Sequence, residues 1–179
     1  MPPNPAHKLE AQQWASTMLS KPSSSWCILD TETTGLEGLV LQIGILAPTG
    51  LVLLDALVHQ PKVEPKAQEV HGISAEMLWG AASWRNVWLA VREILRTREV
   101  VIYNAAFDLA VLERTCKFSG FEFVTPHHHC AMLQNAAYQQ EWNEYRNAYR
   151  WPKLGGGDHS AIGDCRATLE LIHRMAEGL

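Results

Sequence analysis

Five short apolar runs in the chain have the length and the flanking turn residues of β-strands. They cover residues 26–29, 40–47, 51–58, 100–103 and 121–124. The first three follow one another closely, with Pro-Thr-Gly at 48–50 as a turn, and they predict a three-stranded meander. The other two alternate with helical segments. This order of elements predicts an α/β fold with a mixed sheet and helices on both faces.

Most of the remaining apolar residues recur at helical spacing. They predict longer helices over residues 7–20, 83–97, 107–118, 131–149 and 162–176, and short helical pieces at 66–70 and 74–79. In the first of these helices, Leu9, Trp14, Met18 and Leu19 lie roughly on one side. Ser83 is a suitable N-cap for the second.

The chain divides into an N-terminal part and one folded domain. Residues 1–6 are rich in proline and are expected to be frayed, and residues 21–25 form a linker of turn-forming residues. We therefore predict a tail, a helix and a linker over residues 1–25, followed by a single domain over residues 26–179. A length of 179 residues suits one domain with a substantial core.

Composition narrows the class of protein and its compartment. The net charge of −4 argues against a basic protein that coats nucleic acid through many phosphates. No apolar run is long enough to cross a bilayer, and the N-terminus has no apolar signal core. The four cysteines form no CxxC pair, and Cys27 and Cys116 stand in apolar runs as buried thiols. We expect a cytoplasmic protein without a membrane partner.

Acidic residues stand at unusual places in this pattern. Asp30 and Glu32 end the first strand, where residues two apart point to the same side. Asp108 lies in the first turn of the helix that follows the strand at 100–103, and Asp164 lies near the start of the last helix. If the first and fourth strands are neighbours in the sheet, all four carboxylates converge at one edge, where they repel one another unless cations lie between them.

Such a set of oxygen ligands suits Mg²⁺ or Mn²⁺. Two such ions can clamp the attacking and leaving oxygens of a phosphoryl displacement. His159, five residues before Asp164, is a candidate to take the proton of the attacking water.

The motifs around these residues resemble those of the DEDD superfamily of 3′-5′ exonucleases in its histidine form. The segments concerned are Leu29-Asp-Thr-Glu-Thr-Thr-Gly35, Tyr103-Asn-Ala-Ala-Phe-Asp108 and His159-x-x-x-x-Asp164, and His71-Gly-Ile-Ser74 is similar to a segment that many members carry. The three motifs occur in the order of the family, and the resemblance covers about residues 26–175. The group includes the proofreading subunit of the bacterial replicative DNA polymerase and RNase T.

The resemblance implies an RNase H-like fold with a five-stranded mixed sheet flanked by helices. It also implies a 3′-5′ exonuclease domain with two divalent ions, either Mg²⁺ or Mn²⁺, and release of nucleoside 5′-monophosphates. Carried over by position, the metal ligands are Asp30, Glu32, Asp108 and Asp164, and the general base is His159. The residues that hold the substrate strand are Thr31, Thr33, Leu36, Asn104 and Phe107.

The chain departs from the family pattern in two places. Only Gly-Gly-Gly-Asp at 155–158 stands where many relatives have an extra helical segment before the histidine, which predicts a short, mobile loop. His129-Cys130 stands where many relatives have Asp-Thr.

Two further features invite interpretation. Consecutive histidines do not face one site, so we interpret His127-His-His129 as a turn or strand-end feature rather than a zinc site. Trp142 and Trp151 lie in a polar stretch with Arg146, Arg150 and Lys153. This mixture is either a grip for single-stranded substrate or an ordinary surface.

Three readings of the function remain open. The first is an exonuclease acting on the 3′ end of single-stranded DNA, which the Thr-Thr-Gly form of the first motif favours by resemblance. The second is an RNA-trimming enzyme with the same chemistry. The third is a non-catalytic nucleic-acid-binding or polymerase-binding module of the same fold. A homodimer, or a polymerase or repair partner, is compatible with each.

Overall fold

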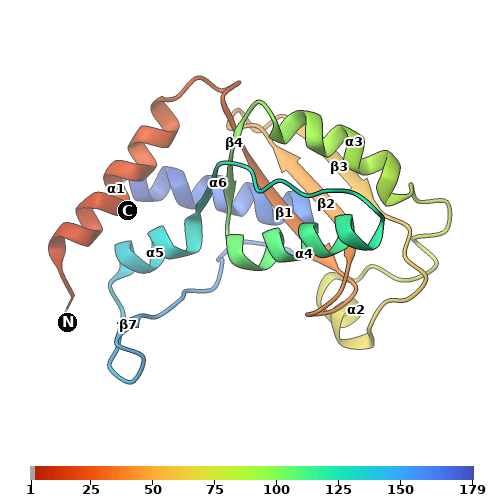
Figure 1. The fold of residues 1–179 in the computed structure, drawn as a ribbon. Coiled ribbons are helices and arrows are strands. Elements are labelled where there is room, and N and C mark those ends of the chain that lie inside the picture. The colour runs from red at the N-terminus through yellow and green to blue at the C-terminus, as the bar shows by residue number, and fades with distance from the viewer. Residues whose placement is uncertain (1–2) are drawn as a thin grey trace.

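The computed structural model describes residues 3–179 and contains the predicted mixed five-stranded sheet (Figure 1). Its strands, in the spatial order β3-β2-β1-β4-β5, are β3 Val52–Leu57, β2 Val40–Leu46, β1 Trp26–Thr33, β4 Glu99–Ile102 and β5 His128–Cys130. The first three strands of the chain form the predicted meander, with antiparallel β1/β2 and β2/β3 pairs. Strands β4 and β5 continue the sheet beyond β1 with parallel pairing.

Helices cover both faces of the sheet, as predicted. They are α1 Pro5–Ser20, α2 Pro65–His71, α3 Trp84–Leu95, α4 Ala105–Phe118, α5 Ala131–Gln139 and α6 Ala161–Glu177. Side chains of β1 alternate between two cores: Cys27 and Leu29 pack with α3 and α4, whereas Trp26 and Ile28 pack with α1, α5 and α6. Because both faces of β1 are buried, its apolar run is continuous rather than alternating. These features confirm the α/β, RNase H-like fold class.

Three predicted elements differ in the structure. The fifth strand lies at His128–Cys130 and not at 121–124, where Phe121 and Phe123 instead pack against the core from an irregular segment. Residues 131–149 do not form one helix. Helix α5 ends at Gln139, because Gln140 adopts a left-handed conformation. A small hairpin of β6 Trp142–Asn143 and β7 Ala148–Tyr149 follows. Residues 75–80 form turns.

The N-terminal helix starts earlier than predicted and buries a different stripe. The Asn4 side chain caps it by accepting from the Ala6 backbone N–H, so order begins inside the segment expected to be frayed; residues 1 and 2 lie outside the described part. Leu9 is exposed, and the buried face consists of Ala11, Ala15 and Met18, flanked by the half-buried Trp14 and Leu19. Within residues 3–179, no helix is long and apolar enough to span a membrane.

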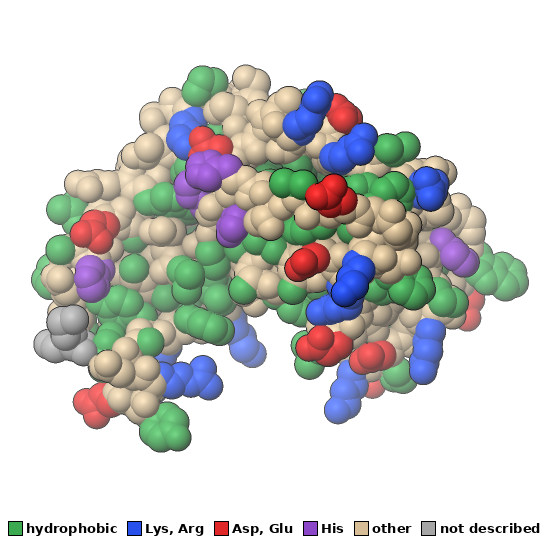
Figure 2. All heavy atoms as spheres, viewed as in Figure 1, with side chains coloured by type: hydrophobic (Ala, Val, Ile, Leu, Met, Phe, Trp, Pro, Cys, Tyr) green, Lys and Arg blue, Asp and Glu red, His purple; other side chains and the backbone are tan. Residues whose placement is uncertain are grey.

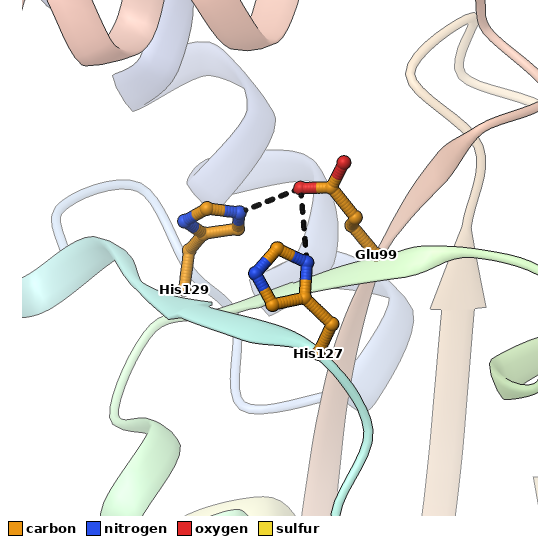
Figure 3. Close-up of side chains that lie close together, drawn as sticks. All are labelled: Glu99, His127 and His129. Atoms are coloured by element: carbon orange, nitrogen blue, oxygen red, sulfur yellow. Dashed lines mark hydrogen bonds and ion pairs between the residues drawn. The ribbon is translucent and has the colours of Figure 1, made fainter.

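The histidine run has an organisation that the sequence prediction missed. His127 and His129 lie two residues apart in extended chain, so they point to the same side and meet Glu99 of the neighbouring strand β4 (Figure 3). His129 Nε2 donates to Glu99 Oε2 over 2.9 Å, and His127 Nδ1 lies 3.3 Å from the same oxygen. His128 points elsewhere and contacts the Pro126 carbonyl.

This cluster already contains its cation. The Lys21 ammonium donates to both oxygens of Glu99, at 2.7 and 2.6 Å, and so places a positive charge beside this carboxylate. Trp14 Nε1 donates to His129 Nδ1 over 3.3 Å, so Nε2 carries the proton that His129 shares with Glu99. Lys21 and His129 hold the pKa of Glu99 low, at about 2. The cluster of Glu99, His127, His129, Trp14 and Lys21 therefore fastens the N-terminal helix and its linker to the edge of the sheet.

Removing the carboxylate of this cluster is expected to loosen the helix. Because a partly buried, charge-assisted pair is lost, Glu99→Gln should lower the free energy of unfolding by about 1–2 kcal/mol at pH 7. The depressed pKa stabilises the fold above about 4.5, the ordinary value of the group, and this contribution disappears as the pH falls through about 2. Urea denaturation of both proteins between pH 2 and pH 7 measures the difference.

The matched control is Glu93→Gln, whose exposed carboxylate pairs with Arg96 on the surface of α3. It should cost less than about 0.5 kcal/mol at every pH. Equal losses for both variants would contradict the fastening role.

Candidate active site

Strand pairing places two of the acidic motifs beside each other. Strands β1 and β4 run parallel, with Leu29 paired to Ile102, so the chain leaving β4 enters α4 next to the end of β1. Asp108, in the first turn of α4, is buried, and one of its oxygens accepts both from the Thr31 backbone N–H (3.1 Å) and from the Thr31 hydroxyl (2.8 Å). These two bonds fix the α4 carboxylate against the strand position between Asp30 and Glu32.

The segment that carries Asp164, at the start of α6, lies on the face of the sheet opposite to α4. Asp30 pairs with Gly44 of β2, and a Cβ atom on Gly44 would lie 2.8 Å from the Ala161 backbone, so only glycine lets the start of α6 approach the sheet so closely. Gln42, the partner of Glu32, accepts from the Ala161 N–H over 3.2 Å, and Ser160 caps the helix. The first turn of α6 thereby brings its carboxylate, that of Asp164, over the end of β1.

Three of the four predicted carboxylates form one cluster, and the fourth lies near it. Oxygens of Asp30, Glu32 and Asp164 all lie within 4.8 Å of one another. Asp108 joins them electrostatically, because its charge raises the pKa values of Asp30 and Glu32. The structure therefore brings Asp30, Glu32 and Asp164 together, with Asp108 close enough to affect their titration.

Burial and mutual repulsion shift the titration of the cluster. Burial is the first cause for every member: it raises the pKa of Asp30 far above its usual range, that of Glu32 to about 8 and that of Asp108 to about 7. The neighbouring carboxylates add to the shifts of Asp30 and Glu32, whereas the bonds from Thr31 moderate that of Asp108. Without a cation, the cluster thus holds protons near neutral pH.

The donor set fits a divalent metal. It offers only carboxylate oxygens close together, with no thiolate or imidazole among the group of Asp30, Glu32 and Asp164. Hard cations such as Mg²⁺ and Mn²⁺ prefer such ligands, and their charge offsets the repulsion that otherwise raises these pKa values.

His159 lies beside the cluster on the loop between β7 and α6. Its backbone N–H donates to Asp164 Oδ1 over 3.3 Å, and its side chain is exposed to solvent. The residue adopts φ of +59°, which is uncommon for a side chain other than glycine and indicates a conformation imposed by the surrounding loop. The imidazole is close enough to affect the titration of both Asp164 and His71.

His71 lines the same region but its ring is already engaged. The Ile73 N–H donates to Nδ1 over 3.0 Å, so the other nitrogen, Nε2, carries a proton and donates to the Thr33 carbonyl over 3.1 Å. Burial lowers the pKa of His71, with His159 adding to this effect. These bonds make His71 a support for the end of β1.

The residues predicted to hold substrate occupy different environments. Thr31 and Thr33 are buried, and their hydroxyls are bonded to Asp108 and to the Gly35 carbonyl. Leu36 is 81% exposed at the tip of the loop after β1. Asn104 is the N-cap residue of α4 without a side-chain capping bond, and Phe107 packs partly against the core.

Sequence reasoning missed the residues that position the acidic set. Gln42 and Gly44 act across the sheet, and only the strand register relates them to Glu32 and Asp30. Gly157 lies so close to Asp164 that a Cβ atom there would collide with its carboxylate. Asp158, which adds its charge to Glu32 and accepts from the Ser160 N–H and hydroxyl, shapes the histidine loop.

The fold and the acidic cluster together define the class of protein, a nuclease built on an RNase H-like sheet. Comparison with known families agrees: the family described as RNase T exonuclease matches residues 27–172, and the chain belongs to this family. The predicted membership of the DEDD 3′-5′ exonucleases is thereby confirmed.

Individual relatives extend the comparison. The chain is 33% identical over 170 residues to the uncharacterized exonuclease CP81 of Escherichia phage 186, covering 84% of this chain and 87% of the relative. It is 31% identical over 99 residues to the epsilon subunit of DNA polymerase III of Escherichia coli K12, covering 48% of this chain and 41% of that subunit. Exonuclease I of E. coli, solved with a dT13 oligonucleotide, shares the fold with a TM-score of 0.65 at 14% identity, over 84% of this chain and 40% of that one.

The raised pKa values predict how the metal-free protein responds to pH. When the pKa of a carboxyl is higher in the folded state than in the unfolded state, the protein becomes less stable as the pH rises from the unfolded pKa to the folded pKa. For Glu32 this range runs from 4.5 to about 8. The melting temperature should therefore fall between pH 5 and pH 8. At pH 8, a Mn²⁺ concentration about 100 times the dissociation constant should restore about 5–10 °C.

Asp30→Asn tests, in the same thermal-melting experiment, whether the pH and Mn²⁺ responses come from the acidic cluster. At pH 8 folding must protonate the buried Asp30 carboxyl, whereas an amide is neutral already, so the variant should melt higher than the wild type at pH 8 without metal. It should also lose the Mn²⁺ response. A wild-type melting temperature that ignores both pH and Mn²⁺ would show that the carboxylates do not share a cation.

Proposed function

We propose that the protein is a 3′-5′ exonuclease that hydrolyses phosphodiester bonds at the 3′ end of single-stranded DNA and releases nucleoside 5′-monophosphates. The observation that carries the proposal is the meeting of Asp30, Glu32 and Asp164 within 4.8 Å, with the buried Asp108 alongside. In this proposal these four residues hold two Mg²⁺ or Mn²⁺ ions. When bound, such ions neutralise charge on the scissile phosphate and lower the pKa of the attacking water.

The protein's own side chains accept the proton and hold the substrate. His159 takes the proton of the water, because its imidazole is exposed beside Asp164 while its backbone N–H fixes it to that carboxylate. Asp108, held by Thr31, keeps its orientation without substrate. The exposed Leu36 contacts the terminal base, the backbone of Thr31 and Thr33 lines its pocket, and Asn104 and Phe107 contact the strand as it enters.

The preference for DNA rests on relatives. The epsilon subunit is part of a DNA polymerase, and Exonuclease I was solved with a DNA oligonucleotide. The rival proposals are an RNA-trimming enzyme of the same chemistry and a non-catalytic module that binds nucleic acid or a polymerase. The complete acidic cluster favours catalysis, since a binding module has no need of it.

We further propose that the protein acts in the cytoplasm, either as a homodimer or beside a polymerase or repair protein. All four cysteines are free thiols, which suits a reducing compartment.

Substitutions at the two ends of the site test the mechanism. Asp30→Asn should abolish hydrolysis, because the ligand set loses a charge. His159→Ala should lower kcat by about 10²–10⁴-fold while metal-dependent thermal stabilisation persists. His173→Ala, an exposed histidine farther along α6, is the matched control and should retain the wild-type rate. A His159→Ala rate within a few-fold of wild type would assign the base to another group.

A panel of matched 5′-labelled oligonucleotides tests the substrate. With Mn²⁺, single-stranded DNA should shorten stepwise from its 3′ end and faster than RNA of the same sequence. Faster loss of RNA would favour the trimming enzyme. Strands of both kinds that stay uncut under these conditions would favour the non-catalytic module.

A further inference from the structure

The β6–β7 hairpin carries a pocket outside the acidic cluster. The pocket has a volume of about 410 Å³ and is lined by Asn143, Arg146, Ala148, Tyr149, Arg150 and Trp151. We propose that it binds an upstream nucleotide of the single strand whose 3′ end occupies the acidic cluster, a proposal that rests on the proposed function. The size is within the range of small-molecule sites.

The base of the hairpin is fastened to the body of the protein. Tyr149 Oη lies 2.9 Å from His7 Nδ1 and accepts from the Asn4 N–H over 3.2 Å, and Gln140 donates to the Asn4 carbonyl. The Trp142 ring meets the Tyr149 ring edge to face, at 5.4 Å between centroids. The Trp142 ring therefore packs within the hairpin, and we do not assign it to the stacking of a substrate base. The fastened base gives the pocket a defined place.

The basic and aromatic side chains in and just after the hairpin are not engaged in comparable contacts. Within residues 3–179, Arg146, Arg150 and Lys153 take part in no ion pair, although the protein as a whole carries a net charge of −4. Trp151 is 63% exposed beside them. Unpaired guanidinium groups next to an exposed indole are the combination that holds phosphates and stacks a base without reading its identity.

The chain connects this pocket directly to the catalytic edge. The Pro152 carbonyl, next to Trp151, accepts from the Tyr103 hydroxyl over 2.8 Å, and Tyr103 immediately precedes the N-cap of α4. From there the segment leads past Gly157, which leaves room for the Asp164 carboxylate, to His159. In Figure 1 this segment runs from the projecting hairpin to the beginning of α6.

The surface around the hairpin fits a strand better than a duplex. Figure 2 shows a hollow along the lower edge of the molecule, between the projecting hairpin and the remaining body. Lys and Arg side chains lie on the side of the projection that faces the hollow. The cations come from one small projection, so they suit a few phosphates of one strand rather than the many contacts of a duplex surface.

The test compares long and minimal substrates. Trp151→Ala and Arg150→Ala should each raise KM for a single-stranded DNA 20-mer about tenfold, with little change in kcat. Hydrolysis of thymidine 5′-monophosphate p-nitrophenyl ester, which is too short to reach the hairpin, should stay at the wild-type level. Phe118→Ala and Arg96→Ala, an exposed aromatic residue and an exposed arginine away from the hairpin, are the matched controls and should change neither substrate.

Binding provides a readout that does not need catalysis. Fluorescence anisotropy with labelled DNA of 3 to 15 nucleotides, measured with Ca²⁺, should show an affinity increase with length that Trp151→Ala removes. Arg150→Ala should make the salt dependence of binding shallower, by about 0.7 in the slope of log K against log salt.

The outcomes separate this inference from the proposed function. An unchanged KM for the 20-mer in both hairpin variants would overturn the nucleotide pocket. An equal loss on the 20-mer and on the short ester would also overturn it, because it would show damage to the catalytic edge. A wild-type protein that cleaves neither substrate would refute the exonuclease, while length-dependent binding abolished by Trp151→Ala would still support the pocket.

Discussion

The proposed catalytic edge is organised around the repulsion of four carboxylates that the fold brings close together. Placing unpaired charges out of water costs several kcal/mol each, and every neighbour of the same sign adds to that cost. The protein meets the cost with rigid supports. Thr31 orients Asp108 with two bonds, Gly44 admits the start of α6, and Gly157 leaves room for Asp164. The cluster is thereby preorganised for cations instead of relaxing away from them.

The two faces of β1 explain why the site contains residues from distant parts of the chain. The α6 face of the strand carries Asp30 and Glu32, continuing the side of Trp26 and Ile28. The α4 face carries Thr31, which reaches Asp108. Both helices therefore contact the end of this strand at their first turns, and the parallel β1/β4 pair fixes this meeting point.

The sequence predicted the elements whose signals are local. The long apolar runs of β1, β2 and β3 and the helical stripe of α3 formed as expected, and three of the four motif acids came together. The three-residue strand β5 was not predicted, because its polar histidines become a strand only through pairing with β4. Lys21 and Glu99 lie 78 residues apart in the sequence, and the contact of His127 with Glu99 depends on that same β4/β5 pairing.

The residues that position the acidic cluster could not be predicted from the sequence either, and the reason is physical. Gln42 and Gly44 owe their roles to the cross-strand register, which a one-residue slip would change completely. The hairpin after α5 escaped prediction because its residues have helical spacing, whereas Gln140 and Asn147 adopt left-handed conformations that end the helix and turn the chain. These local reversals place a hairpin between α5 and the loop that carries His159.

The most direct test of the central claim is the location of bound metal. Crystals soaked in Mn²⁺ at pH 8 should show anomalous scattering peaks between the carboxylates of Asp30, Glu32, Asp108 and Asp164, with Asp30 contacting the ions. Crystals of Asp30→Asn treated in the same way should lack them. An active protein whose wild-type crystals show no ion at this cluster would contradict the account.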